Sequence, residues 1–303
     1  FAPLWHLSQK AAFAGLWWLH GGPCAFLIES YGLYEHTQSD LAASLSASLP
    51  PCFPLLFALA LQPVLEDLKA RSSPGGLQLV FSYLDDLCLA GEQRAVAQAV
   101  AHLNAASERI GLKLNGAKCE IIPCAGLHHT VDPSLFPDSF AFKGDGNFEL
   151  LGGPVGTPEF CNDHTQDRVD RACKVLAALG EVPDPQVALQ LLRHCACFGK
   201  LVYSLRLVPP SHHNAALKNF DLAVRSCFEA FSCFFPSQDE WDLATLSTSR
   251  SGLGLRSTER HSTAAFIASR SACHELCRKI DPNHQWELPG AESDIAKAVQ
   301  AYN

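Results

Sequence analysis

The sequence predicts an α+β fold, with antiparallel strands and helices in its first half and helices in its second half. Apolar and polar residues alternate over 77–83, and a second apolar run follows at 87–90, which is typical of two paired strands. Apolar residues then recur at helical spacing over 96–110. Beyond residue 163 the pattern is helical and is interrupted by proline-containing segments.

The bulk composition indicates a globular protein. The chain has 303 residues, 48% of them hydrophobic, which is enough for a large core and for two domains. The net charge is −8, whereas a protein that binds nucleic acid through charge alone is usually basic. Any contact with nucleic acid is therefore expected to be local, or to lie mostly on a part of the protein outside this chain. The segment 250–279 is locally basic, and its pattern favours a solvated helix face over a track for phosphates.

Thirteen cysteines are present, and we expect free, mostly buried thiols in a reducing compartment. Residues 1–19 lack a basic segment followed by an apolar run, so an intracellular location is favoured over secretion. A structural zinc site needs four ligands, and Cys273, Cys277 and His284 supply only three. The apolar run 53–61 is too short to cross a bilayer, so no membrane partner is expected.

The elements of the first half are predicted from periodicity and from turn residues. Residues 1–50 show no clear pattern, and a helix is expected over 54–69. Its predicted apolar face consists of Leu56, Leu59, Ala60, Pro63, Val64 and Leu68. The hairpin 77–91 is followed by a helix that Gly111 ends as its C-cap. Further short strands are predicted at 112–115, 119–122, 148–151 and 154–155.

Three helical segments are predicted in the second half, near 163–180, 186–207 and 213–235. Proline removes a backbone donor and clashes with the preceding helical turn, so Val182-Pro183-Asp184-Pro185 and Pro209-Pro210 are expected to separate these helices. The boundary between the α+β part and the helical part is expected near residue 160.

Two adjacent acids, Asp85 and Asp86, are predicted at the tip of the hairpin. Like charges this close disfavour ionisation of both carboxyl groups unless a cation lies between them. Mg²⁺ prefers carboxylate and phosphate oxygens, and two such ions can assist a phosphoryl transfer. The alternative interpretation is a solvent-exposed turn without chemistry, because aspartate tolerates turn geometry.

The surrounding segments resemble the reverse transcriptases of non-LTR retrotransposons. In chain order they are 54–63, Tyr83-Leu84-Asp85-Asp86, 111–120, Leu150-Leu151-Gly152-Gly153-Pro154-Val155-Gly156 and 251–256 with 264–266. The resemblance covers roughly residues 54–270, and its specificity comes from the order of the segments. It implies that the protein is an RNA-directed DNA polymerase, which is a nucleotidyltransferase. The implied fold is a partial right-hand palm followed by a helical thumb-like subdomain.

The resemblance also implies roles for individual residues. Asp85 would bind the catalytic metal, and Asp86 would lie beside it. Tyr83 would lie against the primer end, and Lys118 would stabilise the leaving pyrophosphate. Gly152 and Gly153 would form the glycine turn near the primer. The implied cofactor is Mg²⁺, and the implied partners are an RNA template and a DNA primer. Residues 1–53 would be a degenerate fingers and palm remnant, residues 54–160 the palm, and residues 161–303 the thumb with a C-terminal extension.

The chain departs from the family pattern in two places. The family's nucleotide loop contains a glutamine–glycine pair, which is absent from residues 45–53. The family also has a metal-binding aspartate on an earlier strand, and the faintly similar segment 7–13 has Ser8 at that position. We therefore expect the first aspartate strand to precede residue 1. The absence of methionine is typical of a fragment, a processed chain or a conceptual translation.

Three classes of function follow. The first is a degenerate or truncated reverse transcriptase domain of a mobile element, inactive by itself. The second is a non-catalytic relic that binds nucleic acid through the helical part and residues 250–279. The third is an unrelated α+β protein whose Asp85-Asp86 turn is chemically idle.

Overall fold

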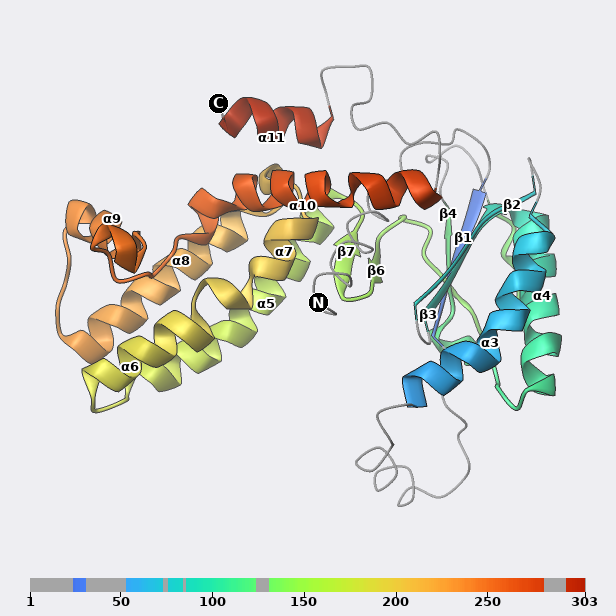
Figure 1. The fold of residues 1–303 in the computed structure, drawn as a ribbon, viewed down its shortest axis with the longest axis horizontal. Coiled ribbons are helices and arrows are strands. Elements are labelled where there is room, and N and C mark those ends of the chain that lie inside the picture. The colour runs from blue at the N-terminus through green and yellow to red at the C-terminus, as the bar shows by residue number, and fades with distance from the viewer. Residues whose placement is uncertain are drawn as a thin grey trace. The chain divides into compact units, whose positions relative to one another are not determined.

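The computed structural model describes residues 24–30, 53–72, 76–83, 86–123, 131–280 and 293–302, and of residues 24–30 it describes the backbone only. These residues fall into two compact units, one ending at Phe148 and the other beginning at Glu149. Figure 1 shows the helices and strands of the chain, coloured from the N-terminus to the C-terminus. The chain is α+β, with small antiparallel hairpins and a helical second part.

The first unit contains a five-stranded sheet in the order β2-β3-β1-β4-β5. The strands are β1 (Cys24–Ser30), β2 (Leu77–Tyr83), β3 (Asp86–Glu92), β4 (Glu120–Pro123) and β5 (Ala141–Phe142). The predicted hairpin is confirmed, because β2 and β3 pair antiparallel. The central strand β1 pairs antiparallel with β3 on one side and with β4 on the other.

The strand β1 was not predicted from the sequence. Residues 24–28 form an unbroken apolar run, so this segment lacks the alternation that identifies a half-buried strand. In the structure β1 lies at the centre of the sheet, between β3 and β4. The predicted strand at 112–115 is wrong. Those residues are irregular, and Leu112 and Leu114 pack half-buried against the core instead.

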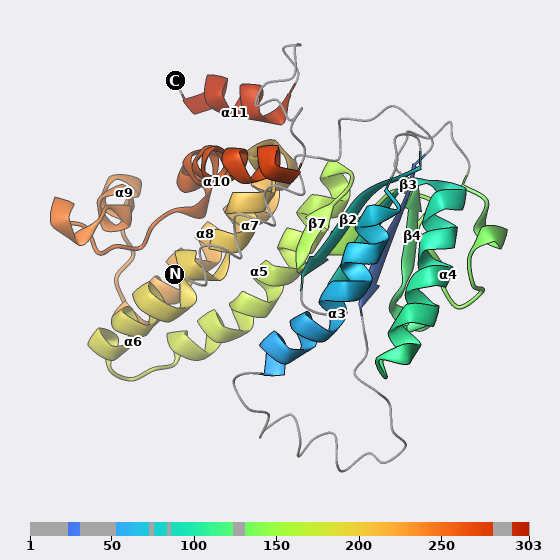
Figure 2. The same ribbon diagram turned by 45° about the vertical axis from the view of Figure 1, so that its right-hand side comes forward.

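Two helices pack against this sheet, α3 (Phe53–Ala70) and α4 (Gln93–Arg109), and Figure 2 shows them side by side along the strands. The core beneath them includes Leu68, Val100, Leu103, Leu87 and Leu89. Helix α4 ends at Arg109 with Ile110 as its C-cap, so the predicted cap Gly111 lies one residue later. Its φ of +79° is the left-handed conformation that glycine adopts without a steric penalty.

The predicted apolar face of α3 is largely wrong. The buried residues are Leu61, Val64 and Leu68, whereas Leu56 and Leu59 are 58% and 59% exposed. The physical reason is that the described core contacts the helix from Phe57 and Leu61 onward, on a face offset from the predicted one. The first turns of α3 therefore carry apolar side chains that the core does not cover.

A two-stranded sheet of β6 (Phe148–Leu150) and β7 (Gly153–Val155) follows in chain order, as the sequence predicts. Helices follow: α5 (Pro158–Gly180), α6 (Pro185–Leu191), α7 (Val202–Leu207), α8 (Pro210–Ser232), α9 (Gln238–Thr245), α10 (Thr258–Ile280) and α11 (Asp294–Tyr302). The long helices α5 and α8 pack along each other, and residues such as Val169, Leu217 and Phe220 form the core between them.

The predicted proline breaks are confirmed, because α5 ends at Gly180 before α6, and α7 ends at Leu207 before α8. The single helix predicted over 186–207 is wrong. A π-helical turn at Leu192–Ala196 and a 3₁₀ turn at Phe198–Lys200 separate α6 from α7. Helix α8 begins three residues ahead of its predicted start, with Pro210 in its first turn, where the missing N–H is no loss.

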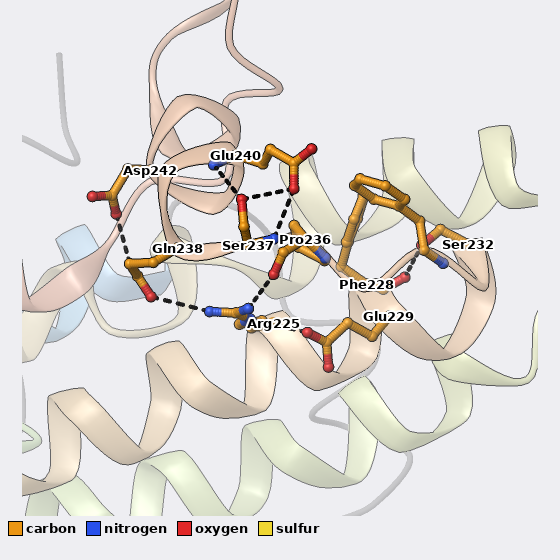
Figure 3. A network of polar contacts seen from close by, with 10 residues as sticks. Arg225, Phe228, Glu229, Ser232, Pro236, Ser237, Gln238, Glu240 and Asp242 are labelled. Atoms are coloured by element: carbon orange, nitrogen blue, oxygen red, sulfur yellow. Dashed lines mark hydrogen bonds and ion pairs between the residues drawn. The ribbon is translucent and has the colours of Figure 1, made fainter.

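A polar network fixes α9 to the end of α8 (Figure 3). The Arg225 guanidinium binds the Glu229 carboxylate at 2.9 Å, the Gln238 side chain at 3.1 Å and the Pro236 carbonyl oxygen. Ser237 caps α9 reciprocally with Glu240. These contacts accompany an apolar one, because Phe228 of α8 and Trp241 of α9 belong to the same core, with ring centroids 5.8 Å apart.

The structure describes ten cysteine side chains as thiols, and seven of them are buried, in agreement with the sequence-based expectation. Burial raises the pKa of the Cys161, Cys197, Cys227 and Cys277 thiols to about 11, so these side chains remain neutral near pH 7. Of the helices that the structure describes, none is long and apolar enough to cross a membrane.

Candidate functional site

One end of the five-stranded sheet brings together three residues from three strands. In the hairpin, Tyr83 of β2 is paired with Asp86 of β3. On its other side, Asp86 is paired with Ser30, the last residue of β1. Tyr83, Asp86 and Ser30 therefore form a row across the sheet, here called the sheet-end row. Leu84 and Asp85 connect the two strands of the hairpin, and both lie outside the described residues.

Lys118 lies at the same end of the sheet. It closes the 3₁₀ turn Gly116–Lys118, two residues before Glu120, which is paired with Ile28 of β1. Because β4 runs antiparallel to β1, this register places Lys118 beside the Ser30 end of β1. Its side chain is exposed. Two of the predicted site residues, Asp86 and Lys118, thus lie on either side of one central strand.

The residue of β1 in register with Asp86 is a serine. The acidic residue of this strand, Glu29, is paired instead with Leu87, which is fully buried in the core with α3 and α4. Residues that face each other across an antiparallel pair share one face of the sheet. The position that would complement Asp86 with a second carboxylate is therefore occupied by a hydroxyl-bearing residue.

The described residues do not by themselves complete a metal centre. Within them, no group of three or more His, Cys, Asp or Glu side chains converges as a metal site would require. Asp86 is half-buried, and Asp85 is adjacent to it in the chain. A cation bound here would use these two carboxylates together with oxygen ligands of a substrate, as Mg²⁺ commonly does.

The second predicted site, the glycine turn, joins β6 to β7 in the other unit. Leu151 and Gly152 both have positive φ, at 51° and 76°, as the two central residues of a tight hairpin turn often do. Gly153 follows as the buried first residue of β7, and a Cβ there would meet the Leu207 side chain at 2.5 Å. The predicted pair Gly152-Gly153 is thus the end of the turn and the start of the strand.

Helices α5 and α7 supply side chains to this turn that the sequence pattern did not identify. Arg168 donates from Nη2 to the Gly152 carbonyl oxygen, and the Tyr203 hydroxyl donates to the Leu151 carbonyl oxygen at 2.9 Å. Burial raises the pKa of the Tyr203 hydroxyl, which keeps it protonated and a donor. Nearby, His164 lies 3.3 Å from the Glu149 carboxylate, and burial lowers the pKa of this imidazole.

The basic segment 250–279 behaves largely as a solvated surface. Its basic side chains are exposed except for Arg270, which is half-buried over the Phe266 ring. Arg256 and Arg260 line a pocket of about 280 Å³ between α8, α9 and the start of α10. Its charges are largely paired, with Lys218 near Glu259 at 3.5 Å and Arg260 near Asp242 at 2.8 Å. This pocket therefore concentrates neither sign of charge.

No protein-family model matches the sequence, and no curated protein matches it.

Proposed function

We propose that this chain is a partial, degenerate reverse transcriptase domain of a mobile element. The family reaction is Mg²⁺-dependent synthesis of DNA on an RNA template, and this chain alone does not carry it out. The observation that supports the proposal most directly is the sheet-end row, in which Asp86 follows a hairpin turn and faces a central strand. A polymerase palm of the right-hand type would place its acidic hairpin in this way.

In this proposal Asp85 and Asp86 would be the residues that hold Mg²⁺. The ion would supply a charge that stabilises the phosphate oxygens during transfer to a primer 3′-hydroxyl. Tyr83, the cross-strand neighbour of Asp86, orients the primer end. Lys118 donates a hydrogen bond to the leaving pyrophosphate from the opposite side of β1.

The proposed inactivity follows from two defects. Ser30 provides no carboxylate opposite Asp86, so one side of the metal site lacks a charged ligand. Residues 45–53, which lie outside the described part, lack the glutamine–glycine pair of the family's nucleotide loop. Loss of one preorganised transition-state interaction costs about 3 kcal/mol, a factor of about one hundred in rate. Two such losses place synthesis below ordinary detection.

The test combines primer extension with metal binding on the full chain. An RNA template with a DNA primer is offered with Mg²⁺ or Mn²⁺, and Asp85→Asn and Asp86→Asn serve as blanks. We expect no extension above the blanks, but weak Mn²⁺ binding, measured by electron paramagnetic resonance, that both substitutions reduce. Extension above the blanks contradicts the inactivity. Mn²⁺ binding that neither substitution changes contradicts the metal role and favours an idle turn.

The second candidate function is nucleic-acid binding without synthesis. It is favoured by the exposure of Arg250, Arg256, Arg260, Arg278 and Lys279 in one segment of the helical unit. Binding through phosphates weakens as salt rises, with a slope that reports the number of contacts. Tight, salt-dependent binding of duplexes by the Asp85→Asn, Asp86→Asn double variant would support this candidate.

A further inference from the structure

Two side chains donate hydrogen bonds to the turn between β6 and β7, one to the Leu151 carbonyl oxygen and one to the Gly152 carbonyl oxygen. We propose that Arg168 and Tyr203 act as positioning residues, which together fix the Leu151–Gly152 turn in the conformation that contacts the nucleic-acid backbone. The proposal rests on the proposed function, because only in a reverse transcriptase domain would the glycine turn lie near the primer. The fixed conformation of the turn is a property of the chain alone, and hydrogen exchange measures it apart from nucleic-acid binding.

The turn needs such support because of its backbone geometry. Leu151 has a φ of 51°, a left-handed conformation in which a side chain with a Cβ is disfavoured by about 1–2 kcal/mol. Residues in such conformations persist where the surrounding structure holds them. Two central residues with positive φ in succession leave few alternatives for the path of the chain. The external contacts therefore select this geometry over a relaxed turn.

Tyr203 supplies the first contact, from α7. Its hydroxyl donates to the Leu151 carbonyl oxygen across 52 positions of sequence. The ring is half-buried, and the raised pKa of its hydroxyl means that the donor proton is present throughout the neutral range. Nearby, Leu207 of the same helix lies against Gly153. Helix α7 therefore contacts both the turn and the strand that follows it.

Arg168 supplies the second contact, from α5. Its Nη2 donates to the Gly152 carbonyl oxygen, and its guanidinium lies over the Tyr203 ring, 5.2 Å from the ring centre. The two positioning residues thus contact each other as well as the turn. Within the part of the chain that the structure describes, the buried Arg168 Nε has no hydrogen-bond partner. A planar guanidinium can stack and donate at once, which a lysine ammonium cannot reproduce.

Fixing the carbonyl oxygens also fixes the opposite side of the turn. A peptide unit is planar and trans, so its N–H points away from its C=O. With the Leu151 and Gly152 oxygens directed at Tyr203 and Arg168, the Gly152 and Gly153 N–H groups point away from these side chains. The two contacts therefore determine the direction in which the Gly152 N–H points.

The test compares Arg168→Lys and Tyr203→Phe with Arg171→Lys in the full chain. Arg171 is exposed on the same helix, and its hydrogen bond among the described residues is a local one to the Asp167 carbonyl oxygen, so it is a matched control. Two quantities are measured: hydrogen exchange of the peptide covering 148–155, and the Kd for a fluorescent primer–template duplex over a range of salt. We expect faster exchange and about fivefold weaker binding, the contribution of one ordinary hydrogen bond, in the first two variants only.

The salt dependence separates positioning from direct contact. A positioning residue lowers affinity without changing the salt slope, whereas a side chain that binds a phosphate reduces the slope by about one when it is removed. Arg168→Lys keeps the positive charge, so Arg168→Gln is added for this comparison. A reduced slope in Arg168→Gln overturns the positioning role in favour of a phosphate contact.

The remaining outcomes are also decisive. Exchange in Arg168→Lys and Tyr203→Phe that matches Arg171→Lys shows that neither side chain holds the turn, and it overturns the proposal. Faster exchange in a chain that binds no duplex even before substitution supports the fixed turn but overturns its link to nucleic acid, together with the proposed function. Tyr203→Phe and Arg168→Lys are also combined, and losses that do not add indicate that the two side chains act as one unit.

Discussion

Ser30 faces Asp86 across the central pair of strands in the five-stranded sheet. The pairing extends to Tyr83, so the acid is flanked by a serine on one neighbouring strand and a tyrosine on the other. A carboxylate at the position of Ser30 would complete a cage of acids around a cation at this end of the sheet. The serine is the local reason why a weak metal site is expected.

Ser30→Asp is predicted to strengthen binding of divalent cations. A unit negative charge about 6 Å from a divalent cation contributes roughly 1.4 kcal/mol even in water, which corresponds to about tenfold in affinity. Titration with Mn²⁺, followed by electron paramagnetic resonance, measures the change. Ser30→Asn has nearly the same shape without the charge and is the control. Equal affinity in the two variants would show that this position does not face the cation.

Gly91→Ala is predicted to destabilise the first unit. A Cβ on Gly91 would lie 2.3 Å from the Gly76 carbonyl oxygen and 2.9 Å from the Leu77 Cα. Both are backbone atoms at the start of the neighbouring strand β2. Relieving this overlap requires β2 to move away from β3, at a cost of about 1–3 kcal/mol. Urea unfolding followed by circular dichroism measures the loss.

Gly111→Ala is the comparison for that prediction. Gly111 also has a positive φ, but a Cβ added there would meet no atom within 4 Å, so only the backbone penalty of about 1 kcal/mol applies. A loss at Gly91 no greater than the loss at Gly111 would mean that the hairpin tolerates a wider strand spacing than its geometry indicates.

Asp221→Ala is predicted to detach the start of α10 from α8. The Asp221 carboxylate accepts hydrogen bonds from the Thr258 N–H at 2.8 Å, the Glu259 N–H at 3.2 Å and the Ser257 hydroxyl at 2.6 Å. Losing this cap removes partners from two helix-terminal N–H groups, and we expect a cost of about 2 kcal/mol. Asp239→Ala, at an exposed position in the first turn of α9, should cost far less in the same unfolding experiment. Equal losses would contradict the capping role.

The sequence predicted those elements whose signals are local. The hairpin 77–91 was evident from alternation, and the helical part was evident from periodicity between prolines. Strand β1 was missed because residues 24–28 form a short unbroken apolar run, which periodicity alone does not assign to a strand or a helix. The face of α3 was misplaced because the face that a helix buries depends on where its core partners begin, which periodicity does not reveal.

The residues of the candidate site likewise divide into those that local motifs predict and those that only the structure brings together. Asp86, Lys118 and the glycine turn were predicted from motifs in the chain, and the structure describes where each of them lies. Ser30 could not be assigned a role, because its importance comes entirely from its register with Asp86. Arg168 and Tyr203 bond to turn residues 16 and 52 positions away, and no local pattern identifies such pairs.

His213 gives the helical unit a specific dependence on pH. Its side chain is fully buried, and its Nδ1 lies 3.2 Å from the Thr165 hydroxyl, which donates to the Cys161 carbonyl oxygen at 2.9 Å. Because that hydroxyl proton is already used, Nδ1 is the donor toward Thr165 Oγ1. Nε2 is then an acceptor, and no donor to it is present among the residues that the structure describes. Burial, with a smaller effect from His212, lowers the His213 pKa from 6.5 to about 4.

This depressed pKa predicts that acid destabilises the folded state. The unfolded chain takes up a proton at His213 as the pH falls through 6.5, while the folded chain resists until about pH 4. The stability is therefore complete above pH 6.5 and is lost as the pH falls toward 4. At pH 5 the loss is roughly 2 kcal/mol, since each pH unit contributes about 1.4 kcal/mol.

Urea unfolding at pH 7.5 and pH 5.0 measures this loss of stability. His213→Asn, which keeps a donor toward Thr165, should lose about 2 kcal/mol less between the two conditions. The other histidines are common to both proteins and cancel in the difference. If the variant does not fold, the His213 ring proton is titrated by NMR in the unsubstituted chain, where a midpoint near 6.5 would contradict the burial argument.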